Sequence, residues 1–254
     1  MKIDGGALML DGKKILVTGA AQGNGAAVAR GLVRFGATVV IADIDAELAE
    51  QTAAAIRADG GNAWAMGMDV ADRESCLAAA EAVHAQSGPL DVLVNNAAIL
   101  RQGTMDDPDF QKNWSDVVRV NLDGTMQPIH AFLPQLRETR GAIVNTASIA
   151  AFFSLGTFSG YAAAKAGVLA LTRSLSRELA LDGIRVNAVV PGAFRTPMTD
   201  YMSPARRDFY MNTISMARFG EPEEMAGPVA FLASDLASYV TGIALPVDGG
   251  FSVS

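Results

Sequence analysis

The sequence predicts an α/β protein with a single doubly wound parallel β-sheet of about seven strands, flanked by helices on both faces. Three observations favour this fold class. Short runs of Val, Ile and Leu alternate along the chain with longer Ala-rich segments of helical periodicity. Most of the short runs carry apolar residues at consecutive positions and are therefore apolar on both faces, as expected for strands buried on both sides. No repeat, linker or low-complexity stretch divides the 254 residues, so we expect one domain over residues 1–254.

The expected elements follow one another regularly. In the first half, strands at residues 14–20, 38–43, 62–69 and 90–98 enclose helices at 24–35, 45–59 and 72–86. Gly60 and Gly61 are a typical C-terminal cap for the second helix. In the second half come a helical stretch at 114–136, a strand at 141–148, a helix at 161–181, a strand at 184–192, an irregular stretch to 219, a helix at 222–234 and a short strand at 243–247. Residues 1–12 are expected to be an N-terminal extension.

The composition excludes several classes of function. The formal net charge is -7, so no basic surface is expected that would bind nucleic acid. A single cysteine, Cys76, cannot form an intrachain disulfide, and one Cys with two His is too few for a typical four-ligand His/Cys metal site, so we expect no metal. No stretch of about 18 apolar residues is long enough to span a membrane. A soluble, cytoplasmic protein is the expectation.

A glycine-rich turn follows the first expected strand. Gly19, Gly23 and Gly25 stand in the segment TGAAQGNG, where the strand ends and the next helix begins. Glycines at such a turn let backbone N–H groups and a helix N-terminus approach a pyrophosphate. The position between strand and helix favours a dinucleotide site over an ordinary turn.

Two carboxylates end the second and third expected strands. Asp43 can accept hydrogen bonds from both hydroxyls of an adenosine ribose and would repel a 2′-phosphate. No Arg or Lys lies in the glycine-rich turn or directly after Asp43, so NAD(H) is favoured over NADP(H). Asp69 can accept a hydrogen bond from an adenine amino group. For both residues the alternative role is to cap the helix that follows.

Tyr161 and Lys165 stand four residues apart at the start of an expected helix. This spacing places an ammonium on the same helix face as a phenol, one turn along. A fixed cation beside a phenol lowers the phenol's pKa from its ordinary value of ~10. Ser148 ends an apolar run upstream, and its hydroxyl can turn into the same cleft. The three side chains indicate an acid/base centre, whereas a Tyr/Lys pair alone would be better explained as a surface pair.

The whole chain resembles the short-chain dehydrogenase/reductase family. The resemblance rests on an ordered set of motifs: TGAAQGNG, Asp43, Asp69-Val70, NNAA from Asn95, Asn121, Ser148, YAAAK from Tyr161, and Pro191-Gly192. It implies a Rossmann fold and an NAD(P)(H)-dependent oxidoreductase. It departs from the family pattern at Asn24, where an aliphatic residue is usual, and at Ala98, where glycine is usual. Both departures concern the affinity for the cofactor and not the type of reaction.

The resemblance also implies roles for individual residues. Tyr161 would be the general acid/base, and Lys165 would lower its pKa and hold the nicotinamide ribose. Ser148 would hydrogen-bond the substrate oxygen, and Asn121 would support a water that leads protons from Lys165 to solvent. Besides Tyr161 and Lys165, the expected cofactor contacts are Gly19, Gln22, Asn24, Gly25, Asp43, Ile44, Asp69, Val70, Asn95, Ala97, Pro191, Gly192, Phe194 and Thr196. For the two amides that begin at Asn95, the alternative is a structural tie between the strand and the loop that follows.

The expected function is oxidation of a secondary alcohol, or reduction of a ketone, by hydride transfer with NAD(H). A moderately apolar small molecule is the favoured substrate; a sugar or polyol and a 3-oxoacyl compound are the alternatives. An alternative of another class is a non-catalytic NAD-binding regulatory protein, although such a protein would be expected to have lost Tyr161, Lys165 or Ser148. All three are present.

Two segments are expected to choose the substrate. One holds Phe152, Phe153, Leu155 and Phe158; the other holds Phe194, Met198, Tyr201, Met202, Phe209, Tyr210, Met211 and Met216. Residues 193–219 are interpreted as a mobile lid over an apolar pocket, with a helix pair packed on the body as the alternative. Arg101 and Arg195 are the nearby cations considered as anchors for an acid group, and both are better explained as surface residues.

The helix at 161–181 carries more apolar surface than a surface helix needs. Ala162, Ala163, Val168, Leu171 and Leu175 lie on more than one of its faces. Excess apolar surface suggests a partner helix, and in the family this helix commonly forms a dimer interface within a tetramer. We therefore expect a homotetramer.

Overall fold

A seven-stranded parallel sheet forms the centre of the computed structural model, which describes residues 2–3, 7–153, 156–200 and 202–253. The strand order is β5-β4-β3-β6-β7-β8-β9. The strands are β3 (Lys14–Thr18), β4 (Thr38–Asp43), β5 (Ala63–Gly67), β6 (Val92–Asn95), β7 (Ala142–Thr146), β8 (Arg185–Pro191) and β9 (Ala244–Val247). Each lies within a predicted run or within one residue of it, and the predicted fold class is confirmed.

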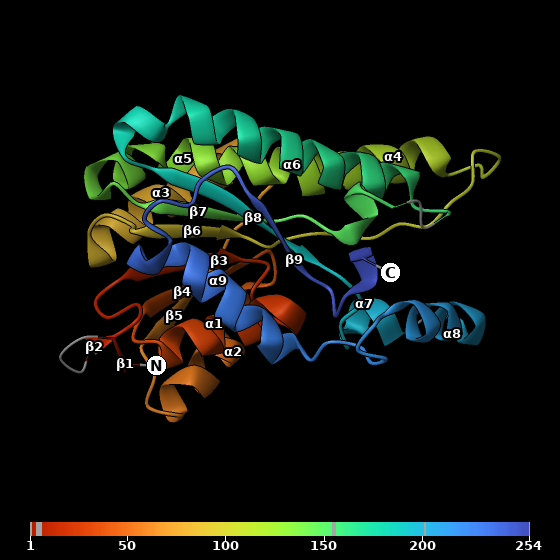
Figure 1. Ribbon diagram of the computed structural model, residues 1–254. Coiled ribbons are helices and arrows are strands. Elements are labelled where there is room, and N and C mark those ends of the chain that lie inside the picture. The colour runs from red at the N-terminus through yellow and green to blue at the C-terminus, as the bar shows by residue number, and fades with distance from the viewer. Residues whose placement is uncertain (1, 4–6, 154–155, 201, 254) are drawn as a thin grey trace.

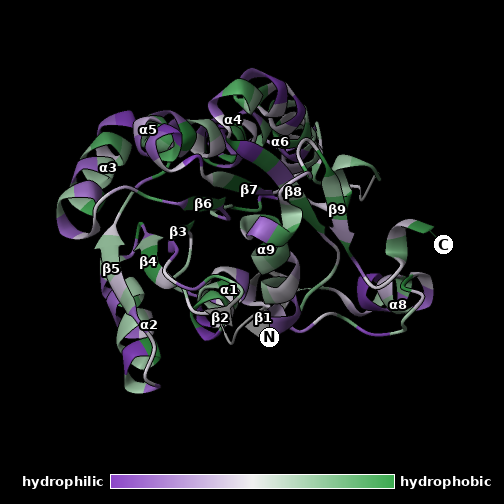
Figure 2. Cartoon of the chain, turned by 60° about the vertical axis from the view of Figure 1, so that its left-hand side comes forward, coloured by the Kyte–Doolittle hydropathy of each residue, from purple (hydrophilic) through white to green (hydrophobic). Residues whose placement is uncertain are grey.

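Helices cover both faces of this sheet (Figures 1 and 2). The longer helices are α1 (Gly23–Arg34), α2 (Ala46–Ala58), α3 (Arg73–Ser87), α4 (Phe110–Val118), α5 (Gly124–Thr139), α6 (Ser159–Glu178) and α9 (Ala226–Ala233). Helices α1, α2 and α9 pack on one face, and α3 and α5 pack on the other, with α4 and α6 alongside. The three central residues of β3 are all apolar because Ile15 and Val17 enter the core on one face of the sheet and Leu16 enters the core on the other.

The order of the strands creates a crevice. The chain runs from β3 outward through β4 to β5 and then crosses back to β6 on the other side of β3. At such a reversal, the loops that follow the two central strands diverge and leave a hollow at the carboxyl edge of the sheet. The residues after β3 and β6 therefore face each other across a candidate ligand site.

Two predicted segments differ from the structure. The expected helix at 114–136 is longer and is interrupted: α4 continues through a π-helical segment, Arg119–Asp123, into α5. The stretch after Gly192, predicted as irregular, contains α7 (Pro197–Asp200) and α8 (Pro204–Thr213). Helix α8 starts because the Ser203 hydroxyl caps it and Pro204 follows at its first position. The irregular conformation predicted there was wrong, whereas the lid role of residues 193–219 stays a prediction.

The remaining parts are small. The predicted N-terminal extension forms a short antiparallel pair, β1 (Lys2–Ile3) with β2 (Ala7–Leu8). Leu155, Tyr201 and the side chain of Met198 lie outside the described residues. Within the described parts of the chain, none of the helices has the length and apolarity that crossing a membrane requires.

Candidate active site

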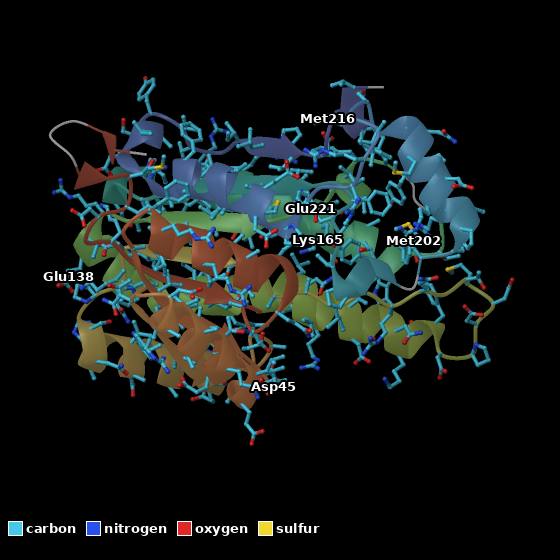
Figure 3. The ribbon with its side chains drawn as sticks, turned by 90° about the horizontal axis from the view of Figure 1, so that it is seen from below. Asp45, Glu138, Lys165, Met202, Met216 and Glu221 are labelled. Carbon is cyan, nitrogen blue, oxygen red and sulfur yellow. The ribbon has the colours of Figure 1, made fainter. Side chains whose placement is uncertain are left out.

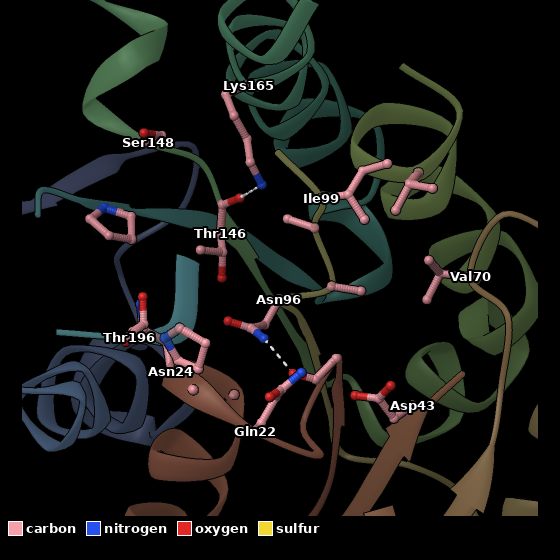
Figure 4. Close-up of a pocket in the computed structure, with 18 of the residues that line it drawn as sticks. Gln22, Asn24, Asp43, Val70, Asn96, Ile99, Thr146, Ser148, Lys165 and Thr196 are labelled. Carbon is pink, nitrogen blue, oxygen red and sulfur yellow. Dashed lines mark hydrogen bonds between the residues drawn. The ribbon is translucent and has the colours of Figure 1, made fainter. Parts of the chain in front are cut away.

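The glycine-rich turn joins β3 to α1 at the crevice (Figure 4). Gly19 and Gly23 have φ of 61° and 57°, a region that favours glycine. A Cβ on Gly25 would lie 2.1 Å from the Gly19 oxygen, so a side chain has no room there. The first turn of α1 carries no acidic residue. Its open N–H groups therefore suit an anionic ligand.

Asn96 fixes this turn from the opposite side of the crevice. Its Nδ2 donates to the Thr18 and Gly19 carbonyl oxygens, each at 3.0 Å. The structure corrects the prediction for Asn95, which is buried in the sheet and donates to Asn145 Oδ1 at 2.9 Å. Successive side chains of a strand point in opposite directions. Of these two adjacent asparagines, Asn95 therefore joins two strands within the sheet, and Asn96 lies on the wall of the site.

A cavity of about 450 Å³ runs along the carboxyl edge of the sheet. Its wall includes every residue predicted to contact the cofactor except Asn95: Gly19, Gln22, Asn24, Gly25, Asp43, Ile44, Asp69, Val70, Ala97, Tyr161, Lys165, Pro191, Gly192, Phe194 and Thr196. Sequence reasoning missed several wall residues, among them Met68, Asn96, Ile99, Arg119, Thr146 and Thr199. Figure 4 shows the labelled wall residues converging on this space.

The Asp43 carboxylate stands at one end of the cavity. Its Oδ2 accepts from the Ala21 N–H at 3.0 Å and its Oδ1 accepts from the Asp45 N–H at 3.2 Å. The helices that follow are capped by Asp45 and Asp72. The alternative that Asp43 and Asp69 are helix caps is therefore wrong, and both carboxylates lie on the cavity wall.

Ser148, Tyr161 and Lys165 meet at the other end of the cavity. Tyr161 lies in the first turn of α6, and the Lys165 Nζ is 5.7 Å from the centre of its ring. The Nζ also donates to the Thr146 oxygen at 2.7 Å, which fixes the ammonium at the cavity wall (Figure 4). Figure 3 shows Lys165 in the interior, whereas Asp45 and Glu138 lie at the surface. Helix α6 thus brings the predicted acid/base pair together.

Burial dominates the electrostatics of this pair. It raises the pKa of the Tyr161 phenol to about 12, and the hydrogen bond with Ser148 acts in the opposite direction. It lowers the pKa of the Lys165 ammonium to about 8. The predicted lowering of the Tyr161 pKa is not found. Burial destabilises the phenolate more than the hydrogen bond with Ser148 stabilises it, so the pKa rises.

Asn121 lies in the π-helical segment and is fully buried. Its Oδ1 accepts from the Ile99 N–H at 2.8 Å, and its Nδ2 donates to the Ile99 oxygen at 2.9 Å. Ile99 is on the cavity wall, but Asn121 is not among the residues that line it. The side chain therefore positions the loop after β6, and its role in proton transfer remains a prediction. π-helical turns frequently occur at functional sites.

Comparisons with known proteins decide the family. A family model described as enoyl-(acyl carrier protein) reductase matches residues 19–252. The chain belongs to the short-chain dehydrogenase/reductase family. It is 37% identical to the 3-oxoacyl-[acyl-carrier-protein] reductase of Thermotoga maritima over 97% of this chain and 100% of that protein. It is also 37% identical to the 2,5-dichloro-2,5-cyclohexadiene-1,4-diol dehydrogenase of Sphingobium indicum, over 96% and 98% of the two chains.

A solved structure of similar fold adds information on ligands. The gluconate 5-dehydrogenase of Burkholderia cenocepacia, in complex with NADP and tartrate, superposes with a TM-score of 0.91 at 34% identity. The match covers 96% of this chain and 97% of that one. Together with the two enzymes above, it shows that family members of similar sequence act on chemically different substrates.

A second, smaller cavity of this family member adjoins the first. It measures about 120 Å³, and it shares Ser148, Tyr161, Gly192 and Thr199 with the larger one. Most of its other wall residues are apolar or aromatic: Leu100, Ile149, Phe158, Met202 and Tyr210. Both predicted substrate segments contribute to it, and Figure 3 shows Met202 at the α7–α8 end of the molecule. Phe152 and Phe153 are instead 54% and 37% exposed.

Lys165→Met is expected to change how stability depends on pH. Because burial lowers the Lys165 pKa from 10.5 to about 8, the unfolded chain binds this proton more tightly than the folded chain. The burial cost is fully present below pH 8 and declines as the pH rises toward 10.5. The wild type should therefore gain on the order of 2 kcal/mol in free energy of unfolding relative to Lys165→Met between pH 7 and pH 10. Urea denaturation at both pH values measures this, and parallel pH dependences would contradict it.

Proposed function

We propose that the chain is an NAD(H)-dependent oxidoreductase that interconverts a secondary alcohol and a ketone. One observation carries the proposal. Ser148 and Tyr161 stand on the wall shared by the larger cavity beside the glycine-rich turn and the smaller, mostly apolar cavity. A substrate oxygen in the smaller cavity would be within reach of a proton donor and close to a cofactor in the larger one.

The residues of the larger cavity fit a nicotinamide dinucleotide. The close approach at Gly25 and the first turn of α1 suit a pyrophosphate. Asp43 suits the two hydroxyls of a ribose at one end. At the other end, the Lys165 ammonium suits the hydroxyls of the second ribose. When bound, the nicotinamide supplies or accepts the hydride.

Protein side chains donate the proton and orient the substrate oxygen. In reduction, the Tyr161 phenol gives its proton to the carbonyl oxygen while the carbonyl carbon gains the hydride, so that a ketone becomes a secondary alcohol. The Ser148 hydroxyl donates to the same oxygen and holds it in place. Because burial raises the Tyr161 pKa to about 12, the phenol is protonated at neutral pH. The protonated phenol favours reduction at neutral pH. Oxidation needs the phenolate as a base, so its rate should increase at alkaline pH.

The apolar lining supports a small ketone or alcohol with an apolar part as the substrate. A panel of ketones and alcohols, including a 3-oxoacyl thioester and a polyol, tests the proposal through the absorbance change of the nicotinamide. Turnover of one class is the expected result. Tight NADH binding without turnover of any compound would favour the alternative of a non-catalytic NAD-binding protein.

Asp43 is proposed to set the preference for NAD(H). A 2′-phosphate near this carboxylate would bring like charges together, which costs several kcal/mol. We expect kcat/KM for NADH to exceed that for NADPH by on the order of 100-fold, and Asp43→Ser to remove most of this difference. Asp45→Ser is the control, since Asp45 caps α2 and is exposed. A wild-type preference for NADPH would overturn the assignment.

A further inference from the structure

A third cavity lies beside the smaller cavity, and one aromatic residue is common to their walls. It measures about 300 Å³ and is lined by Gly103, Thr104, Met105, Ala150, Gly156, Thr157, Phe158, Ser159 and Ala162. The same three parts of the chain contribute to both cavities: residues 100–105, residues 148–150 and residues 156–162. Of the described residues, Phe158 is the one that lines both. Phe158 therefore forms the partition between the smaller cavity and its neighbour.

The Phe158 side chain is held in this position. It is 7% exposed, and the residue directly precedes α6, the helix that carries Tyr161. The Phe158 carbonyl oxygen accepts from the Ala162 N–H at 2.9 Å. The Arg206 guanidinium carbon lies 4.1 Å from the centre of the ring, so the cation packs against it. Because both the backbone and the ring are fixed, Phe158 is a stable part of the wall.

The third cavity suits an uncharged chain. Among the described residues of its wall, none carries a charge. Its outer part faces solvent, since Met105 is 77% exposed and Thr157 and Ser159 are exposed as well. A hydrocarbon chain that extended past Phe158 would therefore find room and would meet no charged side chain.

The two arginines considered from the sequence do not border this path. Arg195 pairs with Glu221 at 3.0 Å and its side chain is 64% exposed. Arg101 is exposed and donates to the Leu100 oxygen. Neither lines the smaller or the third cavity, which agrees with their interpretation as surface residues.

The volume of the smaller cavity limits what it can hold. An apolar protein cavity of about 150 Å³ holds benzene, which has six carbon atoms. The smaller cavity measures about 120 Å³, so by the same ratio it holds about five non-hydrogen atoms. 2-Butanone has this size.

We propose that Phe158 sets the size limit of the substrate, so that ketones of about the size of 2-butanone fit and longer chains are excluded. The inference rests on the proposed function and narrows its substrate class. With a small residue at position 158, the two cavities would join. The chain of a long ketone would then extend from Ser148 and Tyr161 into the third cavity.

A series of methyl ketones tests this proposal. The probes are 2-butanone, 2-hexanone and 2-octanone, with NADH as reductant. In the wild type, kcat/KM should fall by at least about tenfold from 2-butanone to 2-octanone, the factor by which a pocket rejects a group that is too large. In Phe158→Ala, kcat/KM should instead rise with chain length, by up to about fourfold for each CH₂ group that is buried.

Two variants are matched controls. Phe158→Met loses the ring that packs on Arg206 but keeps a side chain long enough to fill the partition, so 2-octanone should stay excluded. Met202→Ala enlarges the smaller cavity without opening the third, because Met202 lines only the first of these two. It should also exclude 2-octanone.

Phe158→Val removes less packing and is the second test if Phe158→Ala does not fold. It should show a smaller gain for 2-octanone. A wild-type kcat/KM that is equal for the three ketones or rises with their length would overturn the proposal. Acceptance of 2-octanone by Met202→Ala to the same extent as by the Phe158 variants would also overturn it.

Binding without turnover separates this inference from the proposed function. A ketone and NAD⁺ are both oxidised, so no hydride transfer occurs between them. Isothermal titration of the protein with NAD⁺ present should show tighter binding of 2-butanone than of 2-octanone, and Phe158→Ala should reverse this order. The same order without reduction of any ketone by NADH would contradict the proposed function alone. Reduction of ketones with no preference for the shorter ones would contradict the role of Phe158 alone, and binding of neither ketone would contradict both.

Discussion

Replacing Tyr161 by Phe is expected to lower kcat for ketone reduction by roughly a thousandfold, the range in which a positioned general acid contributes. The variant loses only the hydroxyl that is proposed to donate the proton, so the wall of the larger cavity keeps its shape. NADH affinity, measured by fluorescence titration, should stay within about fivefold of the wild type, because at most one hydrogen bond to the dinucleotide is lost.

Tyr210→Phe is the matched control for this prediction. Tyr210 is buried and lines the same small cavity as Tyr161, but the proposed mechanism gives its hydroxyl no proton to transfer. A Tyr161→Phe enzyme with turnover close to that of the wild type would show that another group supplies the proton. An equal loss in both variants would show that the effect comes from the shape of the cavity.

Gly25→Ala is expected to damage both stability and cofactor binding. The new Cβ would lie 2.1 Å from the Gly19 oxygen and 2.9 Å from the Ala20 Cα, and backbone atoms cannot move aside as a flexible side chain can. We expect a loss of about 3 kcal/mol in free energy of unfolding, the upper range for an overpacked site. We also expect NADH to bind at least about tenfold more weakly, because the turn that approaches the pyrophosphate must shift.

Gly227→Ala provides the comparison for Gly25→Ala. Gly227 lies in α9, and a Cβ there would meet no atom within 4 Å. Denaturant unfolding and fluorescence titration of NADH should show little change in this variant. A Gly25→Ala protein with wild-type stability and affinity would contradict the proposal that this tight turn binds the pyrophosphate.

The central sheet could be predicted because most of its strands are buried on both faces and therefore contain runs of consecutive apolar residues. Helix ends could also be predicted where the sequence contains a capping motif. Gly60 has a φ of 83°, and the Gly61 N–H donates to the Ile56 oxygen at 2.9 Å, which completes the expected cap of α2. In contrast, the π-helical segment at Arg119–Asp123 has no residue-type signature. It coincides with the anchoring of Asn121 on Ile99, a contact between distant parts of the chain.

In the site as well, some features could be predicted from local sequence and others depend on the fold. The motifs located the glycine-rich turn, Asp43 and the Tyr161–Lys165 pair because local spacing positions them. Asn95 and Asn96 could not be told apart from the dipeptide, since the exact end of β6 decides which side chain faces the crevice. The direction of the Tyr161 pKa shift could not be predicted from the sequence either, because it depends on how deeply other elements bury the phenol.

The expected homotetramer stays a prediction, and one of its reasons is weaker in the structure. Val168, one of the apolar residues that suggested a partner helix, is fully buried in the core of this chain. Leu171 and Leu175 are partly buried against the neighbouring core. Part of the apolar surface of α6 is therefore used within the protomer.

Hydride transfer is the central claim, and isotope transfer tests it most directly. The protein would be incubated with a ketone from the panel and NADH carrying deuterium at both C4 positions, and the alcohol would be examined by mass spectrometry and NMR. The account predicts one deuterium on the carbinol carbon of the product and none without the protein. Recovery of every ketone unchanged, with the deuterium still on NADH, would contradict it.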